Sequence, residues 1–532
     1  MAGEEYARNF SWGNGLRKGD YEAVSPCHPM DLPQSLLEPV LVKYATNHGF
    51  KVRFDTEYLS FAEDETSGKI DCVLKDRLTE LQYTVRTRFL FGADGGRSRV
   101  AQSLNLPFTS IPSGGTAWNI LVKADLSHIM RHREGNLHWC LRLERDYEYM
   151  CVCRMVRPWT EWMFVMFPKG PGILPEPKSK EVWKAIVEDM IDDASVGVEV
   201  LRMDKWVINE TSADHISKGN VQVSPFIFST AKRNDEDQCT EDANQHSFCL
   251  GDAIHRHPPT LGLGSNTCIQ DSYNLAWKIN LVLQNLASPT LLETYNTERQ
   301  PVGAHLVTVS NNALRKHIAV WQAFRCAPPG SSQEQRLAGI VELKSNTKEG
   351  KERRKIMKES IDDIQHETHA LGIERNQLYT GAGIYTFDEP ESFRPQGKEA
   401  QDSELYHEPC TYPGRRLPHV WLRKRIPGPL VSTLDVAGKG NFALFTGIGG
   451  EAWKQAAEIM TKETGIELVV VEIGWGLEWE DVYLDWEVKR EVEENGCVLV
   501  RPDCFVAWRS MKGGDEVGNL RKALRAVLGL HE

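Results

Sequence analysis

The spacing of apolar positions divides the chain into helical and extended regions. Apolar side chains recur at helical intervals in residues 31–47 and from Asn266 to about Leu286. From about Gly115 to Thr211, β-branched and aromatic runs are separated by turn residues, which is typical of a mostly antiparallel sheet. The strands expected there are Thr116–Val122, Leu137–Leu143, Glu148–Met155, Trp162–Phe167 and Glu199–Asn209.

The sequence before and after residues 115–211 predicts further helices and strands. Lys51–Phe54 and Arg86–Phe91 are predicted strands, Val100–Leu104 is predicted to begin a helix, and the charge-rich residues 331–375 predict a helical connector. The C-terminal pattern predicts a βαβ unit followed by a hairpin and a helix, the order of the second half of a thioredoxin-like fold. These elements are expected at Phe442–Thr446, Glu451–Lys462, Glu467–Ile473, Cys497–Arg501, Phe505–Trp508 and Val517–Leu528.

The segment Phe248–Asn266 is the most informative part of the chain. An apolar run ends in Gly251-Asp252, crosses a loop rich in proline and glycine, and enters the long helix. A carboxylate at Asp252 can accept hydrogen bonds from the hydroxyls of a ribityl chain, and a helix N-terminus favours an anion. Reduced flavin carries negative charge on one edge of its ring, so this order of residues points to a flavin site. The alternative is a tight strand–loop–helix corner without a ligand.

A second strand-end turn with a carboxylate occurs at Gly92-Ala-Asp-Gly-Gly. Asp94 could bind a ribose or organise a diphosphate through water, with Arg97 as a counter-charge. Such turns are common, so this one gains specificity only when it is paired with the later segment.

Together the two turns resemble the class A flavoprotein monooxygenases that hydroxylate phenols, in particular the phenol and chlorophenol hydroxylases. Gly92–Arg99 is similar to the family's Asp-Gly motif, which touches the FAD diphosphate and the passing NAD(P)H, and Phe248–Asn266 is similar to its Gly-Asp motif and flavin loop. Pro413–His419 and Arg501–Arg509 resemble parts of the family's thioredoxin-like appendage.

The resemblance implies that NADPH or NADH reduces FAD and that the reduced flavin uses O₂ to hydroxylate a small aromatic molecule, most simply a phenol. No residue is singled out as the general base. The implied site residues are Asp252 on the ribityl chain, Gly264, Ser265 and Asn266 beside the flavin ring, Pro259 near the substrate, and Gln34 against the FAD.

The sequence departs from the family pattern in two places. The family opens with a strand, a Gly-x-Gly-x-x-Gly turn and a helix that seats the FAD diphosphate, and we expect that unit to be missing from this chain. The run Gly438–Ala443 has similar spacing but precedes a predicted strand, so it is not expected to bind a dinucleotide. Residues 222–247 form a polar insertion, for which the hypotheses are a translated intron or a long surface loop.

The expected fold class is α/β, with an incomplete Rossmann-like FAD domain, a β-sheet substrate domain and a C-terminal thioredoxin-like domain. The FAD domain is expected in two parts, and a helical connector should precede the last domain. The predicted boundaries are 1–112 and 221–330 for the FAD domain, 113–220 for the substrate domain, 331–411 for the connector and 412–532 for the thioredoxin-like domain.

Bulk properties narrow the function classes. The net charge of -12 argues against nucleic-acid and anionic membrane surfaces, and no apolar run approaches the ~18 residues that span a bilayer. Twelve scattered cysteines and no visible secretory signal favour a cytoplasmic protein with reduced thiols. A homodimer is a further expectation. His255-Arg-His257 lacks a third ligand, so no metal is expected. The alternative function is a non-catalytic remnant or binding module that keeps the fold without FAD.

Overall fold

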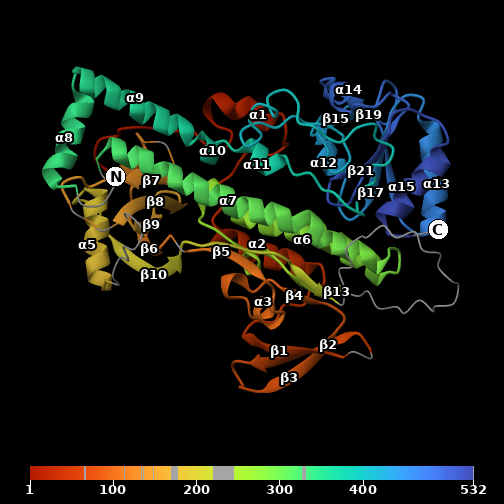
Figure 1. Cartoon of the computed structure of the whole chain (residues 1–532), viewed down its shortest axis with the longest axis horizontal. Helices are drawn as coiled ribbons and strands as arrows, with labels where there is room; N and C mark the ends of the chain where they lie inside the picture. Colours follow the sequence, from red (N-terminus) through yellow and green to blue (C-terminus); the bar gives the residue numbers. More distant parts are fainter. Residues whose placement is uncertain are drawn as a thin grey trace, which may run out of the picture.

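The computed structural model describes residues 1–64, 67–112, 114–133, 135, 137–145, 147, 149–168, 178–219, 245–325 and 331–530. The molecule is elongated, with an antiparallel sheet at one end and the C-terminal domain at the other (Figure 1). Two long helices, α6 (Gly264–Leu283) and α7 (Thr294–Ala323), run between these ends. Of the predicted insertion 222–247, residues 222–244 lie outside the described residues.

The predicted antiparallel sheet is confirmed. Its five strands pair in the order β10-β6-β9-β8-β7, and every pair is antiparallel. Helix α5 (Lys180–Ile191), which was not predicted, covers the sheet with Trp183 and Val187, both fully buried. The strands are β6 (Thr116–Lys123), β7 (Leu137–Cys140), β8 (Tyr149–Arg157), β9 (Glu161–Pro168) and β10 (Glu199–Val207), and the short helix α4 is Ser127–Met130.

The central part contains the two predicted strand-end turns. Strand β4 (Leu90–Gly92) runs parallel to β13 (Gln245–Cys249), which also pairs antiparallel with β12 (Ser217–Gly219). The helix predicted after the first turn is confirmed as α3 (Arg99–Ser103). Nearby, β5 (Phe108–Ile111), β11 (Glu210–Ala213) and β14 (His255–Arg256) form a separate small sheet.

Two strand predictions in this part were wrong in their bounds. Lys51–Phe54 is not extended in a sheet, because the chain turns at Asp55, where φ is +51°, and only then enters β1 (Thr56–Asp64). The predicted run Arg86–Phe91 is split between β3 (Gln82–Thr87) and β4. With β2 (Lys69–Asp76), β1 and β3 form an antiparallel meander that projects from the molecule (Figure 1).

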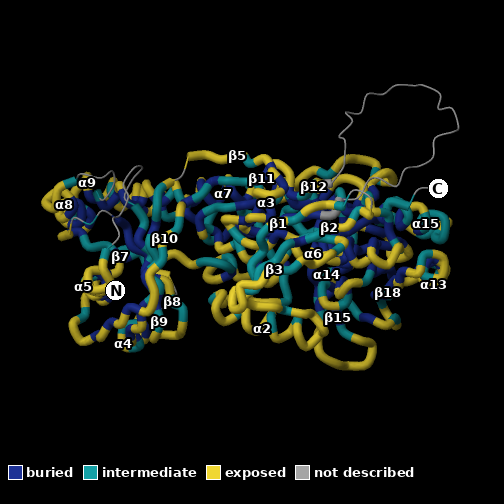
Figure 2. Tube along the Cα trace, turned by 90° about the horizontal axis from the view of Figure 1, so that it is seen from below, coloured by how far each residue is buried: buried dark blue, intermediate teal, exposed yellow. Residues whose placement is uncertain are grey.

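Helix α2 (Gln34–Asn47) confirms the helix predicted in residues 31–47, but it buries none of its residues. Its apolar side chains, including Val40 and Tyr44, are exposed, and the helix is drawn mostly in the exposed colour in Figure 2. The 3₁₀ turn Gly15–Arg17 and helix α1 (Lys18–Glu22) precede it.

The connector is helical as predicted, and the C-terminal end of α7 packs against its helices. The C-terminal end of α7 packs Trp321 and Phe324 against Leu143 and Met150 of the sheet region and against α8 and α9. The connector helices are α8 (Gln333–Lys344), α9 (Lys348–Asp363), α10 (Gln365–Thr368) and α11 (Leu371–Arg375).

The C-terminal domain follows the predicted order of elements. Its sheet has the order β18-β17-β20-β21, with β17 parallel to β18 and antiparallel to β20. The run Gly438–Ala443 leads into strand β17, as predicted. The bounds are β17 (Phe442–Thr446), α13 (Glu451–Thr464), β18 (Leu468–Glu472), β20 (Cys497–Val500), β21 (Val506–Ser510) and α15 (Glu516–Val527), beside the smaller elements β15 (Trp421–Lys424), β16 (Val431–Ser432), α12 (Thr433–Val436), β19 (Trp479–Asp481) and α14 (Asp485–Lys489).

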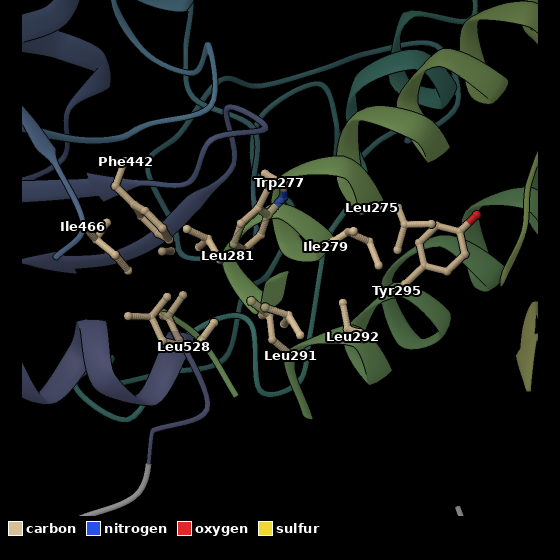
Figure 3. Packing of buried hydrophobic residues seen from close by; sticks show 14 of the residues in the cluster. Leu275, Trp277, Ile279, Leu281, Leu291, Leu292, Tyr295, Phe442, Ile466 and Leu528 are labelled. Carbon is tan, nitrogen blue, oxygen red and sulfur yellow. The ribbon is translucent and has the colours of Figure 1, made fainter. Parts of the chain in front are cut away.

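A continuous apolar core joins the C-terminal domain to α6. Trp277 and Leu281 of α6 face Phe442 and Ile466 of the C-terminal domain, with Leu528 close by (Figure 3). The Trp277 and Phe442 rings meet edge to face at 5.7 Å. Because α6 begins at the predicted flavin loop, this core fixes the helix that carries the loop.

Candidate active site

The structure brings the two predicted turns together. Phe91 and Gly92 of β4 are in register with Phe248 and Cys249 of β13, and the Leu250 amide donates to the Gly92 carbonyl at 3.0 Å. The turns that follow, Gly95–Arg97 and Gly251–Ala253, are in contact at the same edge of the sheet. Gly92 is required there, because a Cβ at this position would lie 2.8 Å from the Val100 side chain.

The Gly251-Asp252 turn presents a free carboxylate. Gly251 has φ +60°, and a Cβ there would lie 2.7 Å from the Cys268 Sγ, so only glycine fits without strain. Asp252 is exposed, and within the described part of the chain its carboxylate accepts no hydrogen bond. An open acceptor at a strand end is what a polyhydroxylated ligand chain needs.

Asp94 lies in the adjacent turn, and its carboxylate already accepts hydrogen bonds from neighbouring residues of the turn and of α3. One carboxylate oxygen accepts the Ser98 hydroxyl, and the other accepts the amides of Arg99 at 2.7 Å and Val100 at 3.3 Å. Ser98 accepts the Ala101 amide at 2.9 Å. Together these two side chains satisfy the first amides of α3, so Asp94 organises the turn that faces Asp252.

The N-terminus of α6 is left open. This helix of 20 residues has no side-chain cap, and the amides of Gly264, Ser265 and Asn266 find no acceptor among the described residues. Ser265 and Asn266 are exposed, and the Asn266 amide side chain donates back to the Gly262 carbonyl at 3.0 Å. The three free amides and the helix dipole make this end an anion site, in the loop where the sequence predicts the flavin ring.

A buried polar network supports this loop from below. The Asp271 carboxylate accepts the Gly251 amide at 3.1 Å, the His255 Nε2 at 2.9 Å and the Arg299 Nε at 2.8 Å. Burial alone would raise the pKa of Asp271, but the charge of Arg299 and the hydrogen bond from His255 outweigh it and lower that pKa. Arg299 continues the network to the Tyr379 hydroxyl at 3.0 Å. The ionised Asp271 therefore fixes the position of the Gly251-Asp252 turn.

A cavity of about 1450 Å³ opens beside the flavin loop. It exceeds the roughly 300–1,000 Å³ of ordinary ligand pockets, so it has room for more than one small ligand. Leu261, at φ +68°, and Leu263 line it from the loop, and the Trp12 indole donates to the Leu261 carbonyl at 3.3 Å. The other walls come from α7, from the connector, from the C-terminal domain and from Met155 and Trp159 of the sheet region.

The other predicted site residues differ in how near they lie to the cavity and to the paired turns. Asn266 lines the cavity, whereas Pro259 is exposed at the start of the short turn Thr260–Gly262. Gln34 lies on the first turn of α2, where its side chain donates to Glu38 at 2.5 Å and is exposed. No contact joins Gln34 to the paired turns within the described part of the chain, and its role stays a prediction.

The sequence analysis missed the support network. Asp271, Arg299 and Tyr379 come from α6, α7 and the connector, and their partners are distant in sequence. A signal was present, because Asp271 and Lys278 recur at helical spacing on one face of α6, together with the polar residues Thr267 and Asn274, and all four are buried. Buried charges of this kind require partners, although the sequence does not say which.

Two family models cover most of the chain. Residues 2–224 and 227–310 match the FAD binding domain, and residues 410–530 match the aromatic-ring hydroxylase C-terminal domain. The chain belongs to the FAD-dependent aromatic-ring hydroxylases. The class A resemblance, the fold class and the FAD cofactor are thereby confirmed, and the alternative of a module that does not hold FAD is not favoured.

Curated relatives and solved structures agree with this assignment. The hydroxylase is 37% identical over 542 residues to the 2,4-dichlorophenol 6-monooxygenase of Delftia acidovorans, covering all of this chain and 85% of that protein. It is 38% identical to the phenol 2-monooxygenase of Pseudomonas sp. (strain EST1001), covering 96% of this chain and 77% of that protein. The structure of the flavin-dependent monooxygenase PieE with FAD and substrate matches at a TM-score of 0.86 and 35% identity, covering 98% of this chain and 84% of that one.

Residues at the paired turns and at the start of α6 have the chemistry to hold the ribityl chain and the ring of FAD. The open carboxylate of Asp252 suits the hydroxyls of the ribityl chain, and the free amides at the start of α6 suit the electron-rich edge of the ring. The enzyme is an FAD-dependent aromatic monooxygenase that acts with O₂ on an aromatic substrate. Within the described ranges, none of the helices has the length and apolar character needed to cross a membrane.

Proposed function

We propose that this hydroxylase inserts one oxygen atom of O₂ into a phenol at the carbon next to the hydroxyl group, with NADPH or NADH as the reductant. The substrate class and position are suggested by two relatives, whose names specify hydroxylation at carbon 6 of 2,4-dichlorophenol and at carbon 2 of phenol. The observation that carries the proposal is the free Asp252 carboxylate beside the uncapped N-terminus of α6.

In this proposal FAD, when bound, supplies the redox chemistry that activates O₂. Asp252 holds the ribityl hydroxyls, and the amides of Gly264, Ser265 and Asn266 stabilise negative charge at the ring edge. Asp94 organises the neighbouring turn, and Asp271 fixes the backbone of Gly251. These roles follow from where the groups lie and from the donors and acceptors that they leave open.

The chain's own contribution to the hydroxylation is a cavity with an apolar part to its lining. Apolar side chains from three parts of the chain line it, including Leu261 of the flavin loop, Val302 of α7 and Phe505 of the C-terminal domain. Excluding water from the reacting groups protects the activated oxygen and strengthens electrostatic interactions inside the site. The C-terminal domain therefore contributes both to the lining of this cavity and to the core that holds α6.

The direct test supplies the purified chain with FAD, NADPH or NADH, phenol and ¹⁸O₂. We expect coenzyme oxidation that depends on the phenol and a catechol that carries one ¹⁸O atom. The variant Asp252→Ala should lose this activity at low FAD and recover part of it at high FAD. Coenzyme oxidation without any labelled product, across a panel of phenols, would refute the proposed substrate class.

A further inference from the structure

Three arginines gather where the connector meets the C-terminal domain. Arg375 ends α11, and Arg415 and Arg416 lie in the turn that begins at Pro413. All three line the same cavity as the flavin loop. Arg415 has hydrogen-bond partners within the protein, whereas the side chains of Arg375 and Arg416 have none among the described residues.

Arg415 has hydrogen-bond partners within the protein through one terminal nitrogen, although its Nε is buried without an acceptor. It binds Glu399 at 2.9 Å and the Asn376 side-chain oxygen at 3.1 Å, and its guanidinium lies over the Phe393 ring at 4.7 Å. The side chains of Arg375 and Arg416, by contrast, make no hydrogen bond or ion pair with any residue that the structure describes. The Arg416 Nε is buried without an acceptor, an arrangement that is costly unless a ligand supplies one.

The electrostatics of this wall agree with an excess of positive charge. Burial and the like charge of Arg416 lower the pKa of Arg375 to about 10. Burial together with Arg415, Arg375 and Arg416 lowers the pKa of His407 to about 3. In both cases burial is the largest cause and the neighbouring arginines add to it, while the charge of Glu374 partly offsets the effect at Arg375.

The neighbouring acid compensates the pair only in part. Glu374 accepts a hydrogen bond from the Tyr21 hydroxyl at 3.2 Å, and burial raises its pKa even though the charge of Arg375 opposes that shift. Across the described ranges it makes no ion pair with either Arg375 or Arg416. Glu399, another acid that lines the cavity, pairs with Arg415 at 2.9 Å.

We propose that Arg375 and Arg416 bind an oxyanion, a phosphate or a carboxylate, carried by a ligand that occupies the flavin cavity. The planar fork of a guanidinium matches these groups through paired hydrogen bonds. Two ligands of the proposed reaction could carry such a group: the phosphates of NAD(P)H, or an acidic substituent on the aromatic substrate. The identity of the ligand rests on the proposed function, whereas the anion site itself does not.

The first experiment measures anion binding directly. The FAD-loaded protein is titrated with inorganic pyrophosphate at constant ionic strength, and binding is followed by calorimetry. We expect saturable binding that weakens by about tenfold or more in the double variant Arg375→Met, Arg416→Met, because two charge-assisted contacts are lost. Arg423→Met is the matched control, since Arg423 lies in the same domain, is partly exposed and pairs with Glu480 at 2.7 Å. Absence of pyrophosphate binding to the unmodified protein would overturn the proposal.

A second experiment separates the two sources of the anion. If the site holds a coenzyme phosphate, the double variant should raise the KM for the coenzyme about tenfold while the KM for every phenol stays constant. If it holds a substrate group, only the KM for carboxylated phenols should rise, and neutral phenols should be unaffected. Unchanged KM values for all of these ligands, in a variant that still holds FAD, would overturn the proposal.

A second pair of variants and the titration of the unmodified protein allow the anion site to be tested even if the methionine variants do not fold. If the methionine variants do not fold, the charge-conserving pair Arg375→Lys, Arg416→Lys takes their place, with weaker pyrophosphate binding expected and unchanged binding contradicting the guanidinium geometry. The pyrophosphate titration of the unmodified protein needs neither turnover nor a variant. A failure of hydroxylation is therefore distinguishable from a failure of the anion site.

Discussion

Arg501 of the C-terminal domain and Glu298 of α7 are joined by two hydrogen bonds, Nη1–Oε1 at 2.6 Å and Nη2–Oε2 at 2.8 Å, and both side chains are fully buried. Lys278 of α6 binds the same carboxylate at 2.8 Å, and Asp503 binds Arg501 at 2.6 Å. Asn274 donates to both Glu298 and Asp503. This network ties the helix that begins at the flavin loop to the C-terminal domain.

Removing the shared charge should destabilise the protein strongly. Glu298→Gln leaves Lys278 buried without its counter-charge and leaves Arg501 with Asp503 alone, so the free energy of unfolding should fall by about 3–5 kcal/mol. Urea unfolding followed by tryptophan fluorescence measures this change. The control Glu463→Gln breaks the exposed pair with Arg521 and should leave stability nearly unchanged. Equal effects of the two substitutions would contradict a structural role for the network.

The same network predicts acid sensitivity. Burial would raise the pKa of Glu298, but Arg501 and Lys278 outweigh it and lower that pKa from 4.5 to about 2. A lowered carboxyl pKa stabilises the folded state above pH 4.5, and this contribution is lost as the pH falls towards 2. Unfolding curves between these values should show the loss in the unmodified protein and a flatter dependence in Glu298→Gln. Parallel curves would show that Glu298 does not titrate as the structure requires.

The Gly251 turn should not tolerate a side chain. Gly251→Ala places a Cβ 2.7 Å from the Cys268 Sγ at a φ of +60°, and strain of this kind costs about 1–3 kcal/mol. Because the turn carries Asp252, FAD affinity should fall together with stability. Gly476→Ala is a matched control, since Gly476 has φ +78° but open space around its Cα. FAD titration and thermal unfolding of both variants separate the steric clash from the backbone effect.

Asp252 and Asp94 should respond differently to substitution. Asp252→Ala removes an exposed acceptor without a protein partner, so we expect unchanged stability and an FAD dissociation constant about tenfold higher. Asp94→Ala removes the acceptor for two amides of α3, so stability should fall by about 1 kcal/mol. Fluorescence titration with FAD and urea unfolding give both quantities. A stability loss in Asp252→Ala as large as in Asp94→Ala would contradict the assigned roles.

The features of the fold that were predicted correctly from the sequence depend on local chemistry. The order of a strand, a glycine loop and a helix is confirmed, whereas the contact of Asp252, Gly264 and Ser265 with FAD stays a prediction. The β-branched and aromatic runs in residues 116–209 likewise predicted the antiparallel sheet.

Pairings across long sequence distances were not predictable in the same way. Arg501 and Glu298 are 203 residues apart, and Asp271 and Arg299 are 28 apart on different helices. Nothing in the local sequence specifies such partners, because a buried charge only requires that some partner exist. The length of α7, with Pro301 inside it, was also missed because proline usually ends a helix.

The central claim is that the paired turns and the start of α6 hold FAD. It is tested most directly by titrating the purified, folded protein with FAD and following the flavin fluorescence and absorbance. The account predicts saturable quenching at one FAD per chain and the visible spectrum of a bound flavin, with binding weakened in Asp252→Ala. A protein that is folded by circular dichroism but neither quenches nor retains FAD would contradict it.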